Sequence, residues 1–179
     1  MNQYHNYIFL NEINDQLSVR IKKIKNVSII YYIDDFQSFN ENNCKIIKNF
    51  CKSINAPFYI VNSIKNALKY KATGIYIKAD HKRIILKKYY KLKIIGSAHN
   101  HLDYFFKKNQ NCNMIMLSPL FYNKKYSNNN ILGTTKFRLI SKDWKINVCA
   151  LGGINKTNVN KIKLIKTKNI AFRSMIYLS

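Results

Sequence analysis

Proline, glycine and acidic residues are scarce in this sequence. Its 179 residues include 2 Pro, 5 Gly and 8 Asp and Glu. With so little Gly, no Gly/Ser-rich segment, linker or repeat suggests a second domain. The 47% of hydrophobic residues, with 13 Tyr and 10 Phe among the aromatics, excludes a disordered basic tail. From this length and composition we expect one folded domain over residues 1–179.

Long apolar stretches are absent as well. Lys or Asn interrupts every hydrophobic run before it reaches the roughly 20 residues that a membrane span needs. The N-terminus has neither the basic start nor the long apolar core of a signal peptide. We therefore expect a cytoplasmic protein that does not cross a membrane.

The cysteines of this sequence lack the spacing of a metal site or of a disulfide framework. The four cysteines form no CxxC pair and have no paired histidines nearby, which argues against a zinc site or a disulfide framework. They are Cys44, Cys51, Cys112 and Cys149. We expect all of them to be buried, reduced thiols.

Positive charge is abundant. The chain has 31 Lys and Arg and a formal net charge of +23, which points first to a nucleic-acid partner. Only four of these residues are Arg, however, and the lysines are spread along the chain among Ile and Asn, as A/T-biased coding would give. The densest stretch, residues 82–91, has the spacing of an amphipathic helix. We expect solvated helix faces rather than a specific nucleic-acid interface.

Eight short apolar runs alternate with segments of helical periodicity. The runs are 7–10, 27–32, 58–61, 74–77, 92–96, 114–117, 148–151 and 170–172. The helices expected between them are 15–23, 42–54, 63–71, 82–91, 101–108, 136–142 and 157–165. Such buried strands alternating with helices predict a parallel sheet built from βαβ units.

Eight such units favour a closed α/β barrel over an open sheet. Barrels of this type average ~250 residues, so this chain predicts a compact (β/α)8 TIM-type barrel, pared down at its C-terminal helix. Residues 122–133 follow the sixth strand and have no regular pattern. In a barrel they would lie on the catalytic face, where we expect a lid.

One motif predicts a phosphate site without reference to any family. Leu151-Gly152-Gly153-Ile154-Asn155 ends the seventh strand and precedes an expected helix. Without side chains, the backbone N–H groups of the glycines can approach an anion, and loops after the seventh and eighth strands of barrels often bind phosphate. The alternative is that the glycine pair is only a tight turn.

From Ala56 onward the sequence resembles the thiamine-phosphate synthase and thiazole tautomerase superfamily of barrels. The pieces that match in order and spacing are 57–62, 67–77, 96–100, 117–121, 132–133 and 150–155. The first 55 residues match only in their strand pattern.

The resemblance implies a transferase that joins hydroxymethylpyrimidine diphosphate to thiazole phosphate and releases diphosphate. Its partners would be small-molecule phosphate substrates, and its cofactor would be Mg²⁺, which neutralises the departing diphosphate. For the thiazole phosphate, the resemblance implies the glycine pair Gly152 and Gly153. It also implies Arg173 and Ser174, just after the eighth strand, which would add a charge and a hydroxyl.

Other residues carried over concern the pyrimidine substrate and the metal. Asn62 and Ser97 would hold the pyrimidine substrate, Asn123 begins the segment that corresponds to the family's phosphate-gripping lid, and Asp80 would be the metal carboxylate. For Ser97 the alternative is a cap on the helix expected at 101–108. His99 is a candidate general base by its chemical type alone.

The sequence also departs from the family pattern. Ser63 stands where the family has its first metal aspartate, and Asp80 lies one position before the second, which His81 occupies. The Gln-x-Arg-x-Lys element after the second strand is replaced by 32–35, Tyr-Ile-Asp-Asp. The tautomerase branch has its catalytic histidine after the sixth strand, where this chain has Ser118 and a proline. Asp34 and Asp35 are alternative carboxylates, although paired aspartates after a strand are common in solvated turns.

These departures leave two rivals to a synthase. One is a non-catalytic relative that binds a thiamine-related phosphate ligand. The other is a basic nucleic-acid-binding protein, which the lack of clustered Arg disfavours. The sequence leaves the oligomeric state open, a homo-oligomer included.

Overall fold

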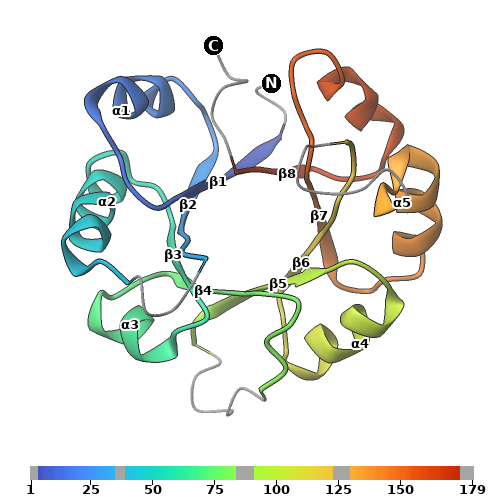
Figure 1. Ribbon diagram of the computed structural model, residues 1–179, viewed down its shortest axis with the longest axis horizontal. Coiled ribbons are helices and arrows are strands. Elements are labelled where there is room, and N and C mark those ends of the chain that lie inside the picture. The colour runs from blue at the N-terminus through green and yellow to red at the C-terminus, as the bar shows by residue number, and fades with distance from the viewer. Residues whose placement is uncertain (1–3, 35–38, 84–90, 123–129, 174–179) are drawn as a thin grey trace.

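Eight parallel strands close into a barrel (Figure 1). The computed structural model describes residues 4–34, 39–83, 91–122 and 130–173. The strands are β1 (His5–Leu10), β2 (Val27–Tyr31), β3 (Phe58–Val61), β4 (Gly74–Ile77), β5 (Lys93–Ala98), β6 (Met114–Leu117), β7 (Asn147–Leu151) and β8 (Asn169–Phe172). Each strand pairs with its sequence neighbours, and β8 pairs with β1. The (β/α)8 barrel predicted from the alternating pattern is confirmed.

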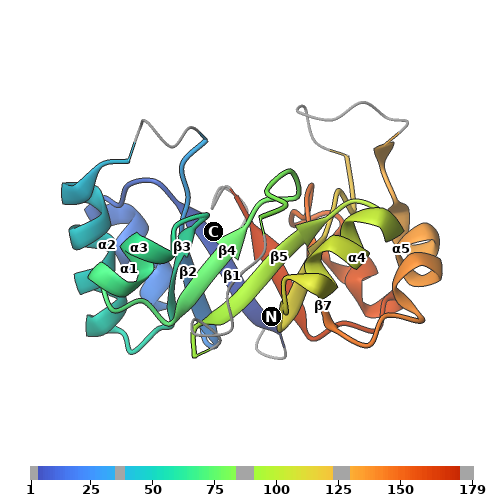
Figure 2. The ribbon, with the colours of Figure 1, turned by 90° about the horizontal axis from the view of Figure 1, so that it is seen from below.

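Helices surround the barrel on the outside, as the side view in Figure 2 shows. They are α1 (Asp15–Lys22), α2 (Glu41–Ser53), α3 (Ile64–Lys69), α4 (His101–Asn109) and α5 (Gly133–Ser141), with a 3₁₀ helix, η4 (Val159–Leu164), after β7. Five of the seven expected helices therefore form as α-helices within a few residues of the predicted bounds.

Two expected helices differ. The segment predicted as a helix over 157–165 is the shorter 3₁₀ helix η4, in keeping with its Asn and β-branched residues and with the short length of such helices. Of the helix predicted over 82–91, residues 84–90 lie outside the described residues, and Lys82 and Arg83 are not helical.

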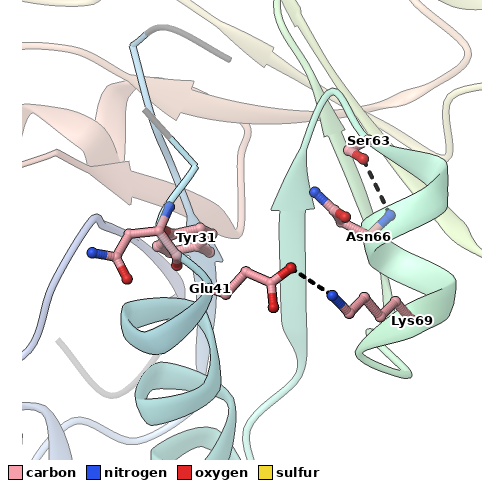
Figure 3. A network of polar contacts seen from close by, with 6 residues as sticks. Tyr31, Glu41, Ser63, Asn66 and Lys69 are labelled. Carbon is pink, nitrogen blue, oxygen red and sulfur yellow. Dashed lines mark hydrogen bonds and ion pairs between the residues drawn. The ribbon is translucent and has the colours of Figure 1, made fainter. Parts of the chain in front are cut away.

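Polar side chains start four of the helices. The N-cap residues of α1, α2, α3 and α4 each accept a hydrogen bond from the backbone N–H three positions on; they are Asn14, Asn40, Ser63 and Asn100. Figure 3 shows this bond between Ser63 and the amide of Asn66, beside the exposed ion pair of Glu41 with Lys69 that joins α2 to α3. Such caps contribute about 1 kcal/mol each, whereas an exposed ion pair contributes little.

Asparagine also takes turn positions that usually require glycine. Among the described residues, positive φ angles of 48–56° occur at four asparagines, Asn26, Asn55, Asn62 and Asn111. Asparagine tolerates this left-handed conformation better than other residues with a side chain. A chain with 5 Gly can therefore still make the tight turns of a barrel.

The core consists mainly of aliphatic residues on the strands. Ile8, Ile29, Ile30 and Ile60 are completely buried, and each such side chain contributes about 1.5–3 kcal/mol by leaving water. The four cysteines are buried free thiols, as predicted. Burial raises the pKa of Cys51 to about 12, so this thiol stays protonated at neutral pH. Within the part of the chain that the structure describes, no helix has the length and apolar character to span a membrane.

Candidate functional site

A cavity of about 1020 Å³ opens where the strands end, at the C-terminal face of the barrel. We call it the mouth cavity. Residues from the ends of β2, β4, β5, β6, β7 and β8 line it, and among them are five of the predicted site residues: Asp80, Ser97, Gly152, Gly153 and Arg173. Active sites of barrels of this type are found at this face. Residues that are far apart in the sequence thus meet in one place.

The glycine pair forms one wall of the mouth cavity. The φ angles of Gly152 and Gly153 are +98° and +67°. A Cβ atom on Gly153 would lie 2.3 Å from the carbonyl oxygen of Phe121. The backbone of Phe121 is held there because its N–H donates to the carbonyl oxygen of Gly152 at 3.0 Å. The tight-turn interpretation is therefore correct for the backbone, and the same turn also lines the cavity.

The backbone N–H groups of Gly152 and Gly153 differ from the carbonyl oxygen of Gly153 in their hydrogen bonding. Among the described residues, no hydrogen bond uses the N–H of Gly152 or Gly153. The carbonyl oxygen of Gly153 is engaged by the side-chain amide of Asn158 at 2.8 Å. This arrangement suits an anion, which requires donors rather than acceptors.

Arg173 reaches from the end of β8 to the aromatic residue after β2. Its Nη2 donates to the hydroxyl of Tyr32 at 2.6 Å, and its guanidinium carbon lies 4.3 Å from the centroid of the Tyr32 ring. Burial raises the pKa of the Tyr32 hydroxyl, an effect that the positive charge of Arg173 opposes. The contact leaves Arg173 exposed at the wall of the mouth cavity. Ser174, predicted to act with it, lies outside the described residues.

A second cation that sequence reasoning missed shares the same ring. The Nζ of Lys78 lies 4.8 Å from the centroid of Tyr32 and donates to the carbonyl oxygen of Asp34 at 2.6 Å. Lys82 also lines the mouth cavity. Lys78 is the first residue after β4, and this position at the C-terminal end of a barrel strand was the signal that could have separated it from the other lysines.

Ser97 lies inside β5 and is not a helix cap. The helix-cap alternative is wrong, because the side chain of Asn100 accepts the hydrogen bond from the N–H of Asp103 at the start of α4. Ser97 is 5% exposed and lines the mouth cavity, as its predicted role in substrate binding requires.

His99 lies beside Ser97 at the same wall. Its Nδ1 is 2.8 Å from the carbonyl oxygen of Ser118, and its backbone N–H donates to Asp103 at 2.9 Å. Since a carbonyl can only accept, Nδ1 carries a proton in this contact. The imidazole is thus fixed across the ends of β5 and β6, and its catalytic role stays a prediction.

The other predicted residues have different positions. Asn62 is not among the residues that line the mouth cavity; its Oδ1 accepts from the N–H of Lys78 at 2.9 Å and so ties the end of β3 to the end of β4. Its contact with a substrate stays a prediction. Asn123 and Asp35 lie outside the described residues. Asp34 lines a neighbouring cavity, which shares Arg173 with the mouth cavity.

Carboxylates for a metal are few. Asp80 is exposed at the mouth cavity, whose wall also includes Asp103. Ser63, at the position of the family's first metal aspartate, caps α3. No group of three or more His, Cys, Asp or Glu side chains that could hold a metal ion occurs in the described part of the chain.

Comparisons with known proteins identify the family of this sequence. The sequence profile of the family described as "Thiamine monophosphate synthase" matches residues 35–176, which extends the similarity to the segment before α2. Two curated relatives named "Thiamine-phosphate synthase", from Prochlorococcus marinus and its subspecies pastoris, are 33% and 34% identical over 133 and 122 residues. The matches cover 72% and 65% of this chain. They cover 37% and 34% of the relatives, so the chain spans about a third of their length.

Solved structures show the same fold. A thiamine phosphate pyrophosphorylase from Pyrococcus furiosus is similar with a TM-score of 0.76 and 19% identity, over 99% of this chain and 89% of that one. Another from Bacteroides thetaiotaomicron has a TM-score of 0.62 and 13% identity, over 95% and 82% of the two chains. At these identities the likeness concerns the barrel alone.

Proposed function

The chain belongs to the thiamine monophosphate synthase family, and on this premise we propose that it makes thiamine phosphate from hydroxymethylpyrimidine diphosphate and thiazole phosphate. The observation that carries the proposal is the meeting of Ser97, Gly152, Gly153 and Arg173 at one cavity. These residues combine a hydroxyl, two backbone donors and a guanidinium, which are the groups that bind phosphate. We include a cytoplasmic location in the proposal.

The charges of the site suit the chemistry of this reaction. The bond between the pyrimidine methylene carbon and the diphosphate oxygen breaks, and its electron pair leaves with the diphosphate. The thiazole nitrogen then supplies the electron pair of the new carbon–nitrogen bond. Lys78, Lys82 and Arg173 place positive charge around the cavity, where it would stabilise the departing diphosphate.

Two tyrosines line the cavity beside its cations. The rings of Tyr32 and Tyr76 have centroids 6.2 Å apart, and both residues line the cavity. Tyr76 packs edge-on against Phe9 at 5.0 Å, which fixes its orientation. A pyrimidine or thiazole ring would lie beside these side chains, with its phosphate groups toward the cations that contact Tyr32.

We further propose Mg²⁺ as the cofactor. Mg²⁺ is usually bound through one or two carboxylates together with substrate phosphates rather than in an all-protein cage. Asp80 and Asp103, which both line the cavity, would supply such carboxylates. When bound with the diphosphate, the ion would neutralise part of its negative charge.

The direct test supplies the purified protein with both substrates and Mg²⁺ and measures thiamine phosphate by chromatography. We expect slow formation, because Ser63 cannot supply the family's first metal carboxylate and the strand-two basic element is missing. Substrate binding without turnover would support the non-catalytic alternative. Absence of both binding and turnover would contradict the proposal.

The metal assignment predicts that Asp80→Asn lowers the rate by about tenfold or more and raises the Mg²⁺ concentration needed for half of the maximal rate. The variant keeps the volume of the side chain and removes its charge. Initial rates against Mg²⁺ concentration measure both effects. Asp143→Asn, at an exposed position outside the cavity, is the matched control. Unchanged Mg²⁺ dependence in Asp80→Asn would place the metal at another carboxylate, such as Asp34 or Asp35.

Nucleic-acid binding should be weak, nonspecific and steeply dependent on salt. Dispersed lysines bind phosphates through counterion release, and a protein with several such contacts loses roughly 10³-fold or more in affinity between about 50 and about 200 mM salt. Fluorescence anisotropy with two unrelated duplexes at these salt concentrations measures the effect. Sequence-selective binding at the higher salt concentration would favour the nucleic-acid-binding alternative.

A further inference from the structure

Lys107, on α4, differs from the solvated lysines of this chain because its side chain is completely buried. Its Nζ donates to the carbonyl oxygens of Lys78 and His81 at 2.7 and 2.8 Å and to the Oε1 of Gln110 at 3.0 Å. An ammonium group has three donors, so all three are used. Burial lowers the pKa of Lys107, but a lysine whose donors are all paired can keep its charge.

Gln110, one turn further along, reinforces the same contact. It is 1% exposed, and its Nε2 donates to the carbonyl oxygens of His81 and Arg83 at 2.9 and 2.7 Å. Lys107 and Gln110 thus make four hydrogen bonds to the backbone of residues 78–83, which we call the β4 loop. A partly buried carbonyl that loses its donor destabilises the structure, so these bonds favour one position of the loop.

Space for the buried lysine comes from a glycine of the sheet. A Cβ atom on Gly96, in β5, would lie 2.9 Å from both Cγ and Cδ of Lys107. The aliphatic stem of Lys107 therefore packs against β5 at Gly96, where any residue with a Cβ atom would collide with it. Without a Cβ at Gly96, the ammonium can reach the β4 loop from the helix side.

The β4 loop forms a wall of the mouth cavity. Four of its residues line the cavity: Lys78, Ala79, Asp80 and Lys82. Within the described part of the loop, the one backbone hydrogen bond of its own is that from the N–H of His81 to the carbonyl oxygen of Lys78, at 3.2 Å. Its position depends mainly on contacts from outside, of which Lys107 and Gln110 supply most of the hydrogen bonds.

We propose that Lys107 and Gln110 are positioning residues that hold the β4 loop where Lys78, Asp80 and Lys82 can reach a phosphate-bearing substrate. Neither residue lines the cavity, so both would act through the loop. The inference rests on the proposed function, because it concerns the same cavity.

Two variants test the proposal. Lys107→Met keeps most of the buried stem and removes the ammonium. Gln110→Glu keeps an acceptor for Lys107 and adds a carboxylate beside it, which helps to preserve the fold, but it removes both bonds from Nε2 to the loop. Lys108→Met is the matched control, since it makes the same charge change at an exposed neighbour on α4.

Inorganic diphosphate with Mg²⁺ serves as the probe. We expect titration calorimetry to show binding weakened about tenfold or more in Lys107→Met and Gln110→Glu, and unchanged in Lys108→Met. Hydrogen exchange should speed up in peptides from the β4 loop and stay unchanged in peptides from β1 and β6. If Lys107→Met fails to fold, Gln110→Glu still gives both measurements.

Double variants distinguish a positioning role of Lys107 from a role in folding alone. If Lys107 acts through the loop, adding Lys78→Ala should weaken diphosphate binding less in Lys107→Met than in the wild-type protein. Additive losses would overturn the proposal, as would unchanged affinity or unchanged loop exchange in folded Lys107→Met or Gln110→Glu. Absence of diphosphate binding by the wild-type protein would contradict the proposed function, whereas loop exchange would still decide whether these two residues hold the loop.

Discussion

Arg173→Met should bind thiazole phosphate roughly 10–100-fold more weakly than the wild-type protein does. A hydrogen bond to a charged group contributes about 1.5–3 kcal/mol, and methionine replaces the stem of arginine without its charge or donors. The structure places the guanidinium against Tyr32 at the wall of the cavity, so it is held in position before a ligand arrives. Calorimetric titration of both proteins with thiazole phosphate measures the loss.

Two further variants separate the charge of Arg173 from its geometry. Arg173→Lys keeps a positive charge but loses the planar fork that contacts both Tyr32 and a phosphate, so we expect an intermediate affinity. Arg138→Met removes an exposed arginine on α5, away from the cavity, and should have no effect. Equal affinities in Arg173→Met and Arg138→Met would show that thiazole phosphate binds elsewhere.

Gly153→Ala should lower the free energy of unfolding by roughly 3 kcal/mol. A left-handed backbone costs an ordinary residue about 1–2 kcal/mol, and overpacking typically adds about 1–3 kcal/mol. Both apply here, because φ is +67° and the new Cβ would meet two backbone oxygens, of Phe121 at 2.3 Å and of Tyr122 at 2.4 Å. Urea unfolding followed by circular dichroism measures the change.

Gly133→Ala is the matched control for this prediction. Gly133 has φ of +60°, and no atom lies within 4 Å of the Cβ position. It should therefore show the backbone cost alone, about 1–2 kcal/mol. Equal losses of unfolding free energy in Gly153→Ala and Gly133→Ala would mean that the backbone of residues 121 and 122 moves away from the new Cβ at no energetic cost. Because Gly153→Ala moves this loop, it is a poorer probe of phosphate binding than Arg173→Met.

The apolar pattern was sufficient to predict the barrel, but only part of the site. The strands over 58–61, 74–77 and 114–117 have the predicted bounds, since turn residues flank short runs that are buried on both faces. A strand that is buried on both faces is apolar along its whole length, so the ends of the apolar run mark the ends of the strand. The strand predicted over 92–96 instead extends to Ala98, because pairing with β6 continues to Leu117. Ser97 therefore belongs to a strand because of its pairing with β6, and the local sequence around Ser97 did not indicate this.

Side-chain placement explains what sequence reasoning missed at the site. Lys78 and Lys107 look alike in a chain with 31 Lys and Arg, yet one contacts Tyr32 and the other is completely buried. What distinguishes Lys107 is the missing side chain of Gly96, a residue eleven positions earlier on another element. Contacts of this kind depend on how α4 packs on β5, and a one-dimensional pattern does not contain that information.

The four asparagines with positive φ bear on how this fold persists under mutational bias. Glycine codons begin with two guanines, so a genome that drifts toward A and T tends to lose them. Asparagine codons begin with two adenines, and asparagine is also the residue with a side chain that best tolerates a left-handed turn. Substitution toward asparagine therefore changes the nucleotide composition while the turns between helix and strand keep their geometry. In engineering terms, glycine should be accepted readily at Asn26 and Asn55, whereas at Asn62 it would remove the hydrogen bond that the side chain accepts from the N–H of Lys78.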